Sequence, residues 1–402
     1  MSVFLETVLV EEAIRRIIAI APVPGAELLP LESVPGRVLS EEVRADIDIP
    51  GFDRSVVDGY AVRSADTTGA GESVPAMLRL TGRITMGDLA AGHSGHTGTC
   101  VYIPTGGEMP RGSDAVAMIE YCELIGDTVL VKRPLANGEN IVLRGEDFHA
   151  GEIVLKPGVR LGPRDIGVLA AVGCTMVPVY RVPRIGIVST GNELVPVTEV
   201  PAGSRVRDVN SYLCSSYVKG LGCEPVLYGI VPDERGALRA ALDSALSECN
   251  AVLTSGGSSK DERDMTASVI QEQGEVLVHG IAIAPGKPTI IGQVGGVPVI
   301  GLPGHPASAF IVLKVVVRHL LDRMTGEQSA GSAVLKSVAL KNIPSLKGRD
   351  EYVRVLVTDR GVTPLFGKSG LLNTLARSNG LVRVPVGSEG VEEGDIVEVI
   401  QW

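Results

Sequence analysis

Several features are scarce or missing in this 402-residue sequence, and each absence removes a class of protein. Aromatic residues make up 3% of the chain and apolar residues 45%, so a globular core has to be built mainly from Val, Ile, Leu and Ala. No window reaches the ~18 uninterrupted apolar residues that a membrane-spanning helix needs. Five charged residues interrupt the N-terminal stretch, which therefore lacks the apolar region of a signal peptide. We expect a soluble cytoplasmic protein with no membrane partner.

Zinc sites and nucleic-acid surfaces also lack support. The six cysteines stand at irregular spacings without a CxxC pair, so neither a zinc site nor a redox motif is predicted, and reduced buried thiols fit a cytoplasmic protein. The formal net charge of −10 and the lack of a Lys/Arg run argue against nucleic acid as a partner. A local cluster of bases could still bind a small anion.

The common catalytic motifs are missing as well. The chain has no HExxH, GxSxG or GxGxxG, so the metalloprotease, serine hydrolase and dinucleotide classes are not supported. The segment "APGKP" at 284–288 resembles a phosphate loop, but Pro288 stands where that loop requires Ser or Thr. Lys287, between two prolines, is then either a fixed cation of a site or a surface lysine.

The rhythm of apolar residues changes along the chain. Residues 6–21 predict an amphipathic helix, and about 28–150 contains short β-type runs broken by Gly, Pro and Asp, which indicates a β-rich insertion. Residues 163–180 predict a helix followed by an extended segment. The C-terminal part, from 332 to 402, has the short strands of a small β-barrel.

From about residue 183 strands alternate with helices. This pattern predicts a parallel sheet covered by helices on both faces. We expect strands at "RIGIVST", "EPVLYGIV" and "AVLTSGG", and helices at 208–220 and 233–248. A tight pair of extended segments, "PTIIGQV" and "VPVIGLPG", and a long helix from Pro306 should follow. The fold class is therefore α/β plus β, in a multidomain chain.

Polar segments follow three strands of the α/β part: "STGNEL" (189–194), "TSGGSSKDERD" (254–264) and "GLPGHPASA" (301–309). Because parallel strands bring their carboxyl ends to one edge of the sheet, the three should meet at one site. In the second, the residues Ser255, Gly256 and Gly257 can offer hydroxyl and backbone N–H groups to an anion. Asp264 and the acids before it are oxygen ligands suited to Mg²⁺. Alternatively, the segment is a solvated loop that caps the next helix.

In the β-rich insertion, "DRSVVDGYA" and "NIVLRGED" place acids next to a glycine turn. Aspartate beside glycine commonly forms turns, so Asp58, Glu146 and Asp147 are either turn formers or site residues. The residues alone do not decide between these roles.

Taken together, seven segments resemble the molybdopterin molybdenumtransferase (MoeA) family, which includes the C-terminal domain of gephyrin. They stand in the family's order and are "FDRSVVDGYA", "IPTGG…PRGSDAV", "NIVLRGED", "STGNEL", "SGGSSKDERD", "APGKP" and "GLPGHPASA". The resemblance covers nearly the whole chain and implies an elongated homodimer with four domains per chain. These would be a discontinuous linker domain (1–27 and 152–182), the β-rich insertion (28–151), a MogA-like α/β domain (183–331) and the C-terminal β-barrel (332–402).

The resemblance also implies a transferase of molybdenum cofactor biosynthesis. Members of the family insert molybdate, or the similar tungstate, into molybdopterin adenylate and release AMP, with Mg²⁺ required. The cofactor expected here is therefore Mg²⁺, and the substrates are molybdopterin adenylate and one of the two oxyanions. An expected partner is the adenylyltransferase that supplies molybdopterin adenylate.

The resemblance assigns roles to individual positions of this chain. Acids matching the pterin, nucleotide and Mg²⁺ pocket are Glu193, Asp208 and Asp264. Residues matching those that the insertion presents to that pocket across the dimer are Asp58, Thr105 and Asp147. Positions matching those associated with oxyanion binding are Lys287, Ser308, Arg354 and Ser369. Cations and hydroxyls suit an oxyanion, and acids suit the metal that neutralises a phosphoryl group.

Departures from the family pattern leave an alternative open. Ala284 stands where many relatives have a lysine, and Val57, Ser258 and Asp261 also differ from the usual residues. Losing one charged hydrogen bond should weaken oxyanion binding by about 1.5 to 3 kcal/mol. The alternative function is a catalytically weakened, gephyrin-like dimeric scaffold or binding protein. An unrelated nucleotide-binding α/β enzyme would leave the insertion motifs unexplained.

Overall fold

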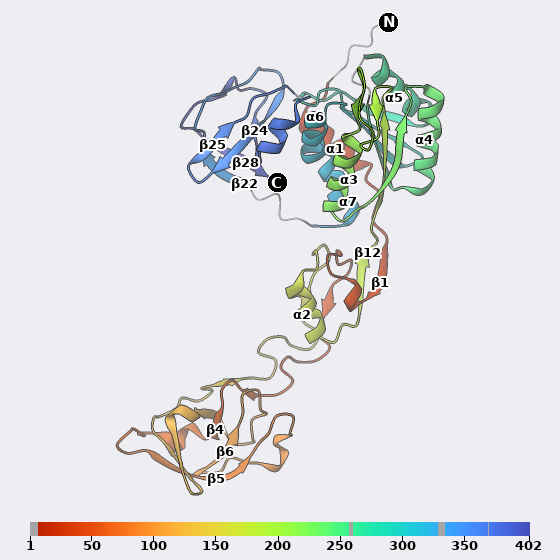
Figure 1. The fold of residues 1–402 in the computed structure, drawn as a ribbon. Coiled ribbons are helices and arrows are strands. Elements are labelled where there is room, and N and C mark those ends of the chain that lie inside the picture. Colours follow the sequence, from red (N-terminus) through yellow and green to blue (C-terminus); the bar gives the residue numbers. More distant parts are fainter. Residues whose placement is uncertain (1–6, 257–259, 329–333, 369) are drawn as a thin grey trace.

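The computed structural model describes residues 7–256, 260–328, 334–368 and 370–402, without the side chains of 260–264. Figure 1 shows an elongated molecule with the β-rich insertion at one end, a small linker module in the middle, and the α/β part beside a β-barrel at the other end. The multidomain α/β plus β class is confirmed. Among the described residues, no helix is long and apolar enough to cross a membrane.

The insertion is built on a six-stranded sheet with the order β7-β4-β6-β5-β9-β8. Its strands are β4 (Gly59–Val62), β5 (Ala76–Arg83), β6 (Thr99–Ile103), β7 (Ala115–Met118), β8 (Cys122–Ile125) and β9 (Thr128–Val131). Strand β3 (Arg54–Ser55) pairs with β10 (Ile141–Val142), where the chain enters and leaves this region. The short runs that predicted β-structure are therefore strands of one sheet.

The linker module lies where the two chain segments leading to the insertion pass each other. Strand β1 (Ala26–Pro30) pairs with β12 (Met176–Tyr180), and β2 (Val43–Arg44) pairs with β11 (Ile153–Leu155). Helix α2 (Pro163–Ala171) starts with proline, and Asp165 Oδ2 accepts the Gly162 N–H at 2.9 Å. Leu39, Leu161 and Leu169 form the centre of the module's core.

The N-terminal amphipathic helix is α1 (Val10–Ala19), somewhat shorter than the predicted 6–21. Its buried residues Val10, Ala13 and Ile17 pack into the core of the α/β part, not against α2. The domain boundaries derived from the sequence stay predictions.

The α/β part contains a six-stranded mixed sheet with the order β16-β13-β17-β21-β20-β18. Its strands are β13 (Arg184–Thr190), β16 (Glu224–Val231), β17 (Ala251–Ser255), β18 (Glu275–His279), β20 (Ile290–Val294) and β21 (Val297–Leu302). The first four in this order are parallel, but β20 runs antiparallel to both of its neighbours. Gly295 and Gly296, both with positive φ, join β20 to β21 in a tight hairpin, which is why a wholly parallel sheet was a wrong expectation.

Helices cover both faces of this sheet. On one face α3 (Asn210–Gly220) and α6 (Pro306–Val312) share a hydrophobic core with α1, and on the other α4 (Arg235–Glu248) packs with α5 (Lys260–Gln273). The long helix expected from Pro306 is divided by a π-helical turn at Leu313–Val317 before α7 (Arg318–Thr325). Because α5 begins at Lys260, residues 260–264 belong to a helix and not to the loop that we expected.

The C-terminal part is a small barrel. Its strands are β22 (Val334–Val338), β24 (Asp350–Thr358), β25 (Gly361–Pro364), β26 (Gly380–Val384) and β28 (Ile396–Gln401). They follow the order β24-β26-β28-β22, with β25 on the other side of β24, and a bridge between Ala339 and Val362 closes the ring. The short strand β19 (Ile283–Ala284) of the α/β part pairs with β24, so the two parts share a sheet.

Candidate functional site

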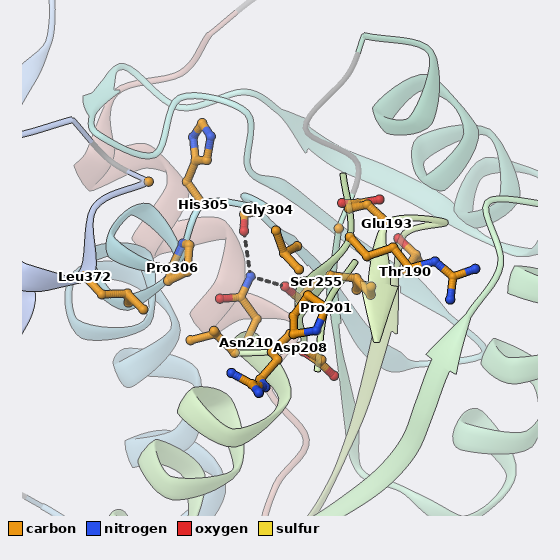
Figure 2. Close-up of a pocket in the computed structure, with 17 residues that line it drawn as sticks. Thr190, Glu193, Pro201, Asp208, Asn210, Ser255, Gly304, His305, Pro306 and Leu372 are labelled. Atoms are coloured by element: carbon orange, nitrogen blue, oxygen red, sulfur yellow. Dashed lines mark hydrogen bonds between the residues drawn. The ribbon is translucent and has the colours of Figure 1, made fainter. Parts of the chain in front are cut away.

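A cavity lies at the carboxyl ends of the parallel strands, where the three polar segments meet. It has a volume of about 700 Å³ and is closed on one side by the segment that leads into α8 (Leu372–Arg377) of the barrel part. Figure 2 shows the labelled side chains around it. Its lining includes Thr190, Glu193, Arg205, Arg207, Asp208, Asn210, Ser255, Gly256, Gly304 and His305.

Asp208 is held firmly beneath the pocket. Its side chain is only 5% exposed, and Oδ1 accepts hydrogen bonds from Ser189 Oγ and the Ser211 N–H, both at 3.1 Å. Oδ2 accepts a third from Ser211 Oγ at 2.5 Å. The contact with the Ser211 N–H places this carboxylate at the N-terminus of α3, where it satisfies a backbone donor of the first turn. Burial, reinforced by the charge of Asp208, raises the pKa of the adjacent Cys214 thiol to about 12.

Gly256 allows β13 and β17 to end in close contact. Its φ is +152°, and a Cβ at this position would lie 2.2 Å from the carbonyl oxygen of Thr190. Any side chain would therefore push the two strand ends apart. The close approach brings Ser255 and Thr190 to the same wall of the pocket.

Asn210 connects the segments after β17 and β21. Its Nδ2 donates to Ser255 Oγ at 2.7 Å and to the Gly304 carbonyl at 2.8 Å, as the dashed lines in Figure 2 show. The Gly304 carbonyl can only accept, so it fixes which side of the amide carries the nitrogen. Asn210 is 7% exposed, and within the described part of the chain its Oδ1 has no hydrogen-bond partner.

Charged side chains also line the pocket. The Glu193 carboxylate is exposed and makes no hydrogen bond or ion pair with any residue that the structure describes. Arg205 and Arg207 add two cations to the lining, and both contact Glu199. The site can therefore meet a ligand that combines phosphate groups with a bound divalent cation.

The predicted metal ligands differ in their surroundings. Within the described part of the chain, no group of three or more acids, histidines or cysteines is placed to hold a metal ion. The Asp208 carboxylate already accepts three protein hydrogen bonds, whereas the Glu193 carboxylate accepts none from described residues. The side chain of Asp264 lies outside the described residues. Mg²⁺ commonly takes one or two carboxylates and completes its shell with water and substrate phosphates, so Glu193 suits this role.

The insertion residues lie far from this pocket in the same chain, at the other end of the molecule (Figure 1). Asp58, just before β4, accepts hydrogen bonds from the Thr105 N–H at 2.7 Å and from Thr105 Oγ1 at 3.0 Å. These two hydrogen bonds hold the pKa of Asp58 below its usual range, and the bond from the Thr105 N–H has the larger effect. Asp147 is exposed, where the insertion joins the linker module. The structure thus brings Asp58 and Thr105 together but leaves both outside their own chain's pocket.

One of the residues predicted to bind the oxyanion lies at a second cavity. Arg354, which is 6% exposed, lines a second cavity of about 230 Å³ together with Ala284 and Glu351. Its Nη2 donates to the Gly367 carbonyl at 2.8 Å, and Nη1 has no hydrogen-bond partner among the described residues. Burial lowers the pKa of this guanidinium.

Two further predicted residues do not line either cavity. Lys287 is exposed, two residues after Pro285 of the second cavity, and Ser308 is buried in α6. Gly257 and Ser369 lie outside the described residues. Sequence reasoning did not select Asn210, Arg205, Arg207 or Gly304, although Asn210 stands two positions after Asp208 and Gly304 belongs to "GLPGHPASA".

Comparisons with known proteins cover almost the whole chain. Residues 8–173 match the model of the MoeA N-terminal region (domain I and II), 186–323 that of a probable molybdopterin binding domain, and 336–402 that of the MoeA C-terminal region (domain IV). A putative molybdopterin biosynthesis protein of Methanocaldococcus jannaschii is 35% identical over 372 residues, which cover 90% of this chain and 89% of that protein.

Two further relatives extend this similarity. The molybdopterin molybdenumtransferase of Bacillus subtilis is 30% identical over 401 residues, covering 97% of this chain and 93% of the relative. The crystal structure of a molybdopterin biosynthesis moeA protein from Pyrococcus horikoshii OT3 is similar with a TM-score of 0.87 and 32% identity. That match covers 99% of this chain and 100% of the other.

Proposed function

Because this chain belongs to the MoeA family, we propose that it inserts molybdate, or tungstate, into molybdopterin adenylate and releases AMP with the help of Mg²⁺. The observation that carries the proposal is the cavity of about 700 Å³ at the strand ends, with its arginines, a carboxylate and a buried amide. A pocket of this size with few polar groups suits a cofactor-sized ligand.

The pocket offers a distinct contact to each part of such a ligand. The unpaired Oδ1 of Asn210 can accept a hydrogen bond from an N–H group of a pterin or an adenine. Arg205 and Arg207 carry the positive charge that phosphate oxygens require. Mg²⁺, held through Glu193 and the substrate phosphates, would supply positive charge as the phosphoryl bond breaks.

The second cavity is the proposed oxyanion site. A buried arginine with an unpaired N–H group supports binding of an anion, because an unpaired buried charge is costly. Lys287 is the exposed cation near it. Ala284, which stands where many relatives have a lysine, pairs in register with Glu351, and both residues line the cavity. We expect oxyanion binding to be weaker than in those relatives.

The arrangement supports a homodimer whose active site is shared between chains. Asp58, Thr105 and Asp147 lie at the end of the molecule remote from the pocket, so only a second copy could bring them to it. The adenylyltransferase that supplies molybdopterin adenylate remains a proposed partner.

The test is to incubate the protein with molybdopterin adenylate, Mg²⁺ and either oxyanion, and to measure AMP together with reactivation of an apo-molybdoenzyme. We expect AMP release that requires both metal and oxyanion. The alternative, a weakened gephyrin-like scaffold, is favoured by the Ala284–Glu351 pair. Tight binding of molybdopterin adenylate without any AMP release would support that alternative and end the catalytic proposal.

A further inference from the structure

Residues 144–150, which carry Asp147, wrap around residues 48–50 where the insertion meets the linker module. Ile49 donates its N–H to the Phe148 carbonyl at 2.7 Å, and its own carbonyl accepts the N–H groups of Phe148 at 3.1 Å and Asp147 at 3.0 Å. The two chain segments between insertion and linker are therefore paired at this crossing.

One carboxylate holds both ends of the wrapped segment. Asp48 Oδ2 accepts Nε–H of Arg144 at 2.8 Å, and Oδ1 accepts the Ala150 N–H at 2.9 Å. The Asp48 side chain is 21% exposed, so the carboxylate lies mostly under the segment. The hydrogen bond from the Ala150 N–H and, to a smaller extent, that from Arg144 lower the pKa of Asp48. Asp147 lies between the two attachment points.

Further contacts surround the start of the segment. Gly145 has a φ of +73°, and a Cβ there would lie 2.5 Å from His149 Nδ1 and 3.6 Å from Asp48 Cβ. Asp53 Oδ1 accepts the Arg144 N–H at 2.8 Å, which adds a second fixed point at the same end. The Asp147 carboxylate itself makes no hydrogen bond with the described residues, so its direction depends on this backbone.

We propose that Asp48 is a positioning residue that fixes Asp147 for its work in the pocket of a second copy of the chain. The inference rests on the proposed function, because it assumes that Asp147 reaches that pocket. Asp48 would act through the backbone of 144–150 and would not touch the substrate. A displacement of about 1 Å at a reacting group can cost on the order of 100-fold in rate, so loss of the attachment should be visible in turnover.

The test compares Asp48→Asn with Glu42→Gln in the full-length protein. Asparagine keeps the size of the side chain but removes the charge that holds Arg144. Glu42 is a matched control, because it pairs with Arg44 on the exposed surface of the same linker module. Arg144→Gln, at an arginine that is 64% exposed, releases one end of the segment without threatening the fold.

For Asp48→Asn we expect kcat for AMP release to fall about 10- to 100-fold, with the KM for molybdopterin adenylate changed less than about twofold. Hydrogen exchange of the Ala150 amide should become faster, and Arg144→Gln should show a smaller fall in kcat. Glu42→Gln should match wild type in all three measurements.

The outcomes separate this inference from the proposed function. Faster exchange at Ala150 with an unchanged kcat would overturn the positioning role and leave the proposed function intact. A rise in KM equal to the fall in kcat/KM would assign Asp48 to substrate binding and also overturn it. If wild type itself releases no AMP, the proposed function fails, and the positioning role in that reaction fails with it.

Discussion

Asp208 of the pocket and Asp58 of the insertion are held in opposite ways. Asp208 is buried and accepts three hydrogen bonds beneath the cavity, whereas Asp58 is exposed and both of its bonds come from Thr105. The pocket is lined by residues of one chain, while the insertion, which carries Asp58 and Thr105, lies at the other end of the molecule. This difference supports the proposal that a second chain brings the two regions together.

The largest expected effect comes from inactivating the pocket in one chain and the insertion in another. Glu193→Gln and Asp147→Asn should each reduce AMP release by about 100-fold or more, because each removes a charge proposed to act at the reacting centre. Mixing the two inactive proteins should restore about one quarter of wild-type activity, since half of the dimers are mixed and each has one intact site.

Steady-state AMP release after exchange of subunits measures this restoration. Mixing Glu193→Gln with Asp208→Asn is the control, because both substitutions lie in the pocket and no intact site can form. Equal activity in the two mixtures would show that the pocket and the insertion of the same chain work together.

A second effect of intermediate size concerns stability. Asp208→Ala should lower the free energy of unfolding by about 2–4 kcal/mol, because it leaves buried hydroxyl groups and a helix N–H without their acceptor. Asp58→Ala removes an exposed group and should shift the unfolding midpoint far less. Urea unfolding followed by far-ultraviolet circular dichroism, which reports on all domains, measures both. Equal urea midpoints for Asp208→Ala and Asp58→Ala would show that the two carboxylates contribute equally to stability.

The smallest expected effect is the pH dependence of the Asp58–Thr105 contact. The pKa of Asp58 is lowered in the folded protein, so its contribution is present above the unfolded pKa of about 3.9 and is lost as the pH falls through the folded value. The difference in thermal midpoint between wild type and Asp58→Asn should be constant from pH 5 to 8 and shrink only below about pH 4. If the difference in thermal midpoint changes with pH near neutrality, another titrating group is responsible.

The position of the pocket could be predicted from the sequence because it follows from strand direction alone. Parallel strands end at one edge, and the polar segments containing Glu193, Ser255 and Gly304 stand after three of them. The pairing of Asp58 with Thr105, 47 positions away, could not be predicted in this way, because it depends on how the sheet of the insertion folds.

The errors also have physical causes. Strand β18 was not predicted, and the expectation of a parallel sheet was wrong because β20 and β21, the predicted pair of extended segments, form an antiparallel hairpin closed by Gly295 and Gly296. Asp208 stays a predicted metal ligand, but its hydrogen bond from the Ser211 N–H was not predicted, because that contact depends on α3 beginning two residues later. Asn210 was overlooked because its two acceptors lie in distant segments.

The pairing of β19 with β24 has a consequence for the solubility of fragments. In the whole chain β19 covers the backbone groups at the start of β24, where Asp350 donates its N–H to the Ala282 carbonyl at 2.9 Å. A fragment containing only the C-terminal barrel would leave this edge bare, and an uncovered strand edge recruits strands from other molecules. The barrel on its own should therefore tend to aggregate, although its core is complete.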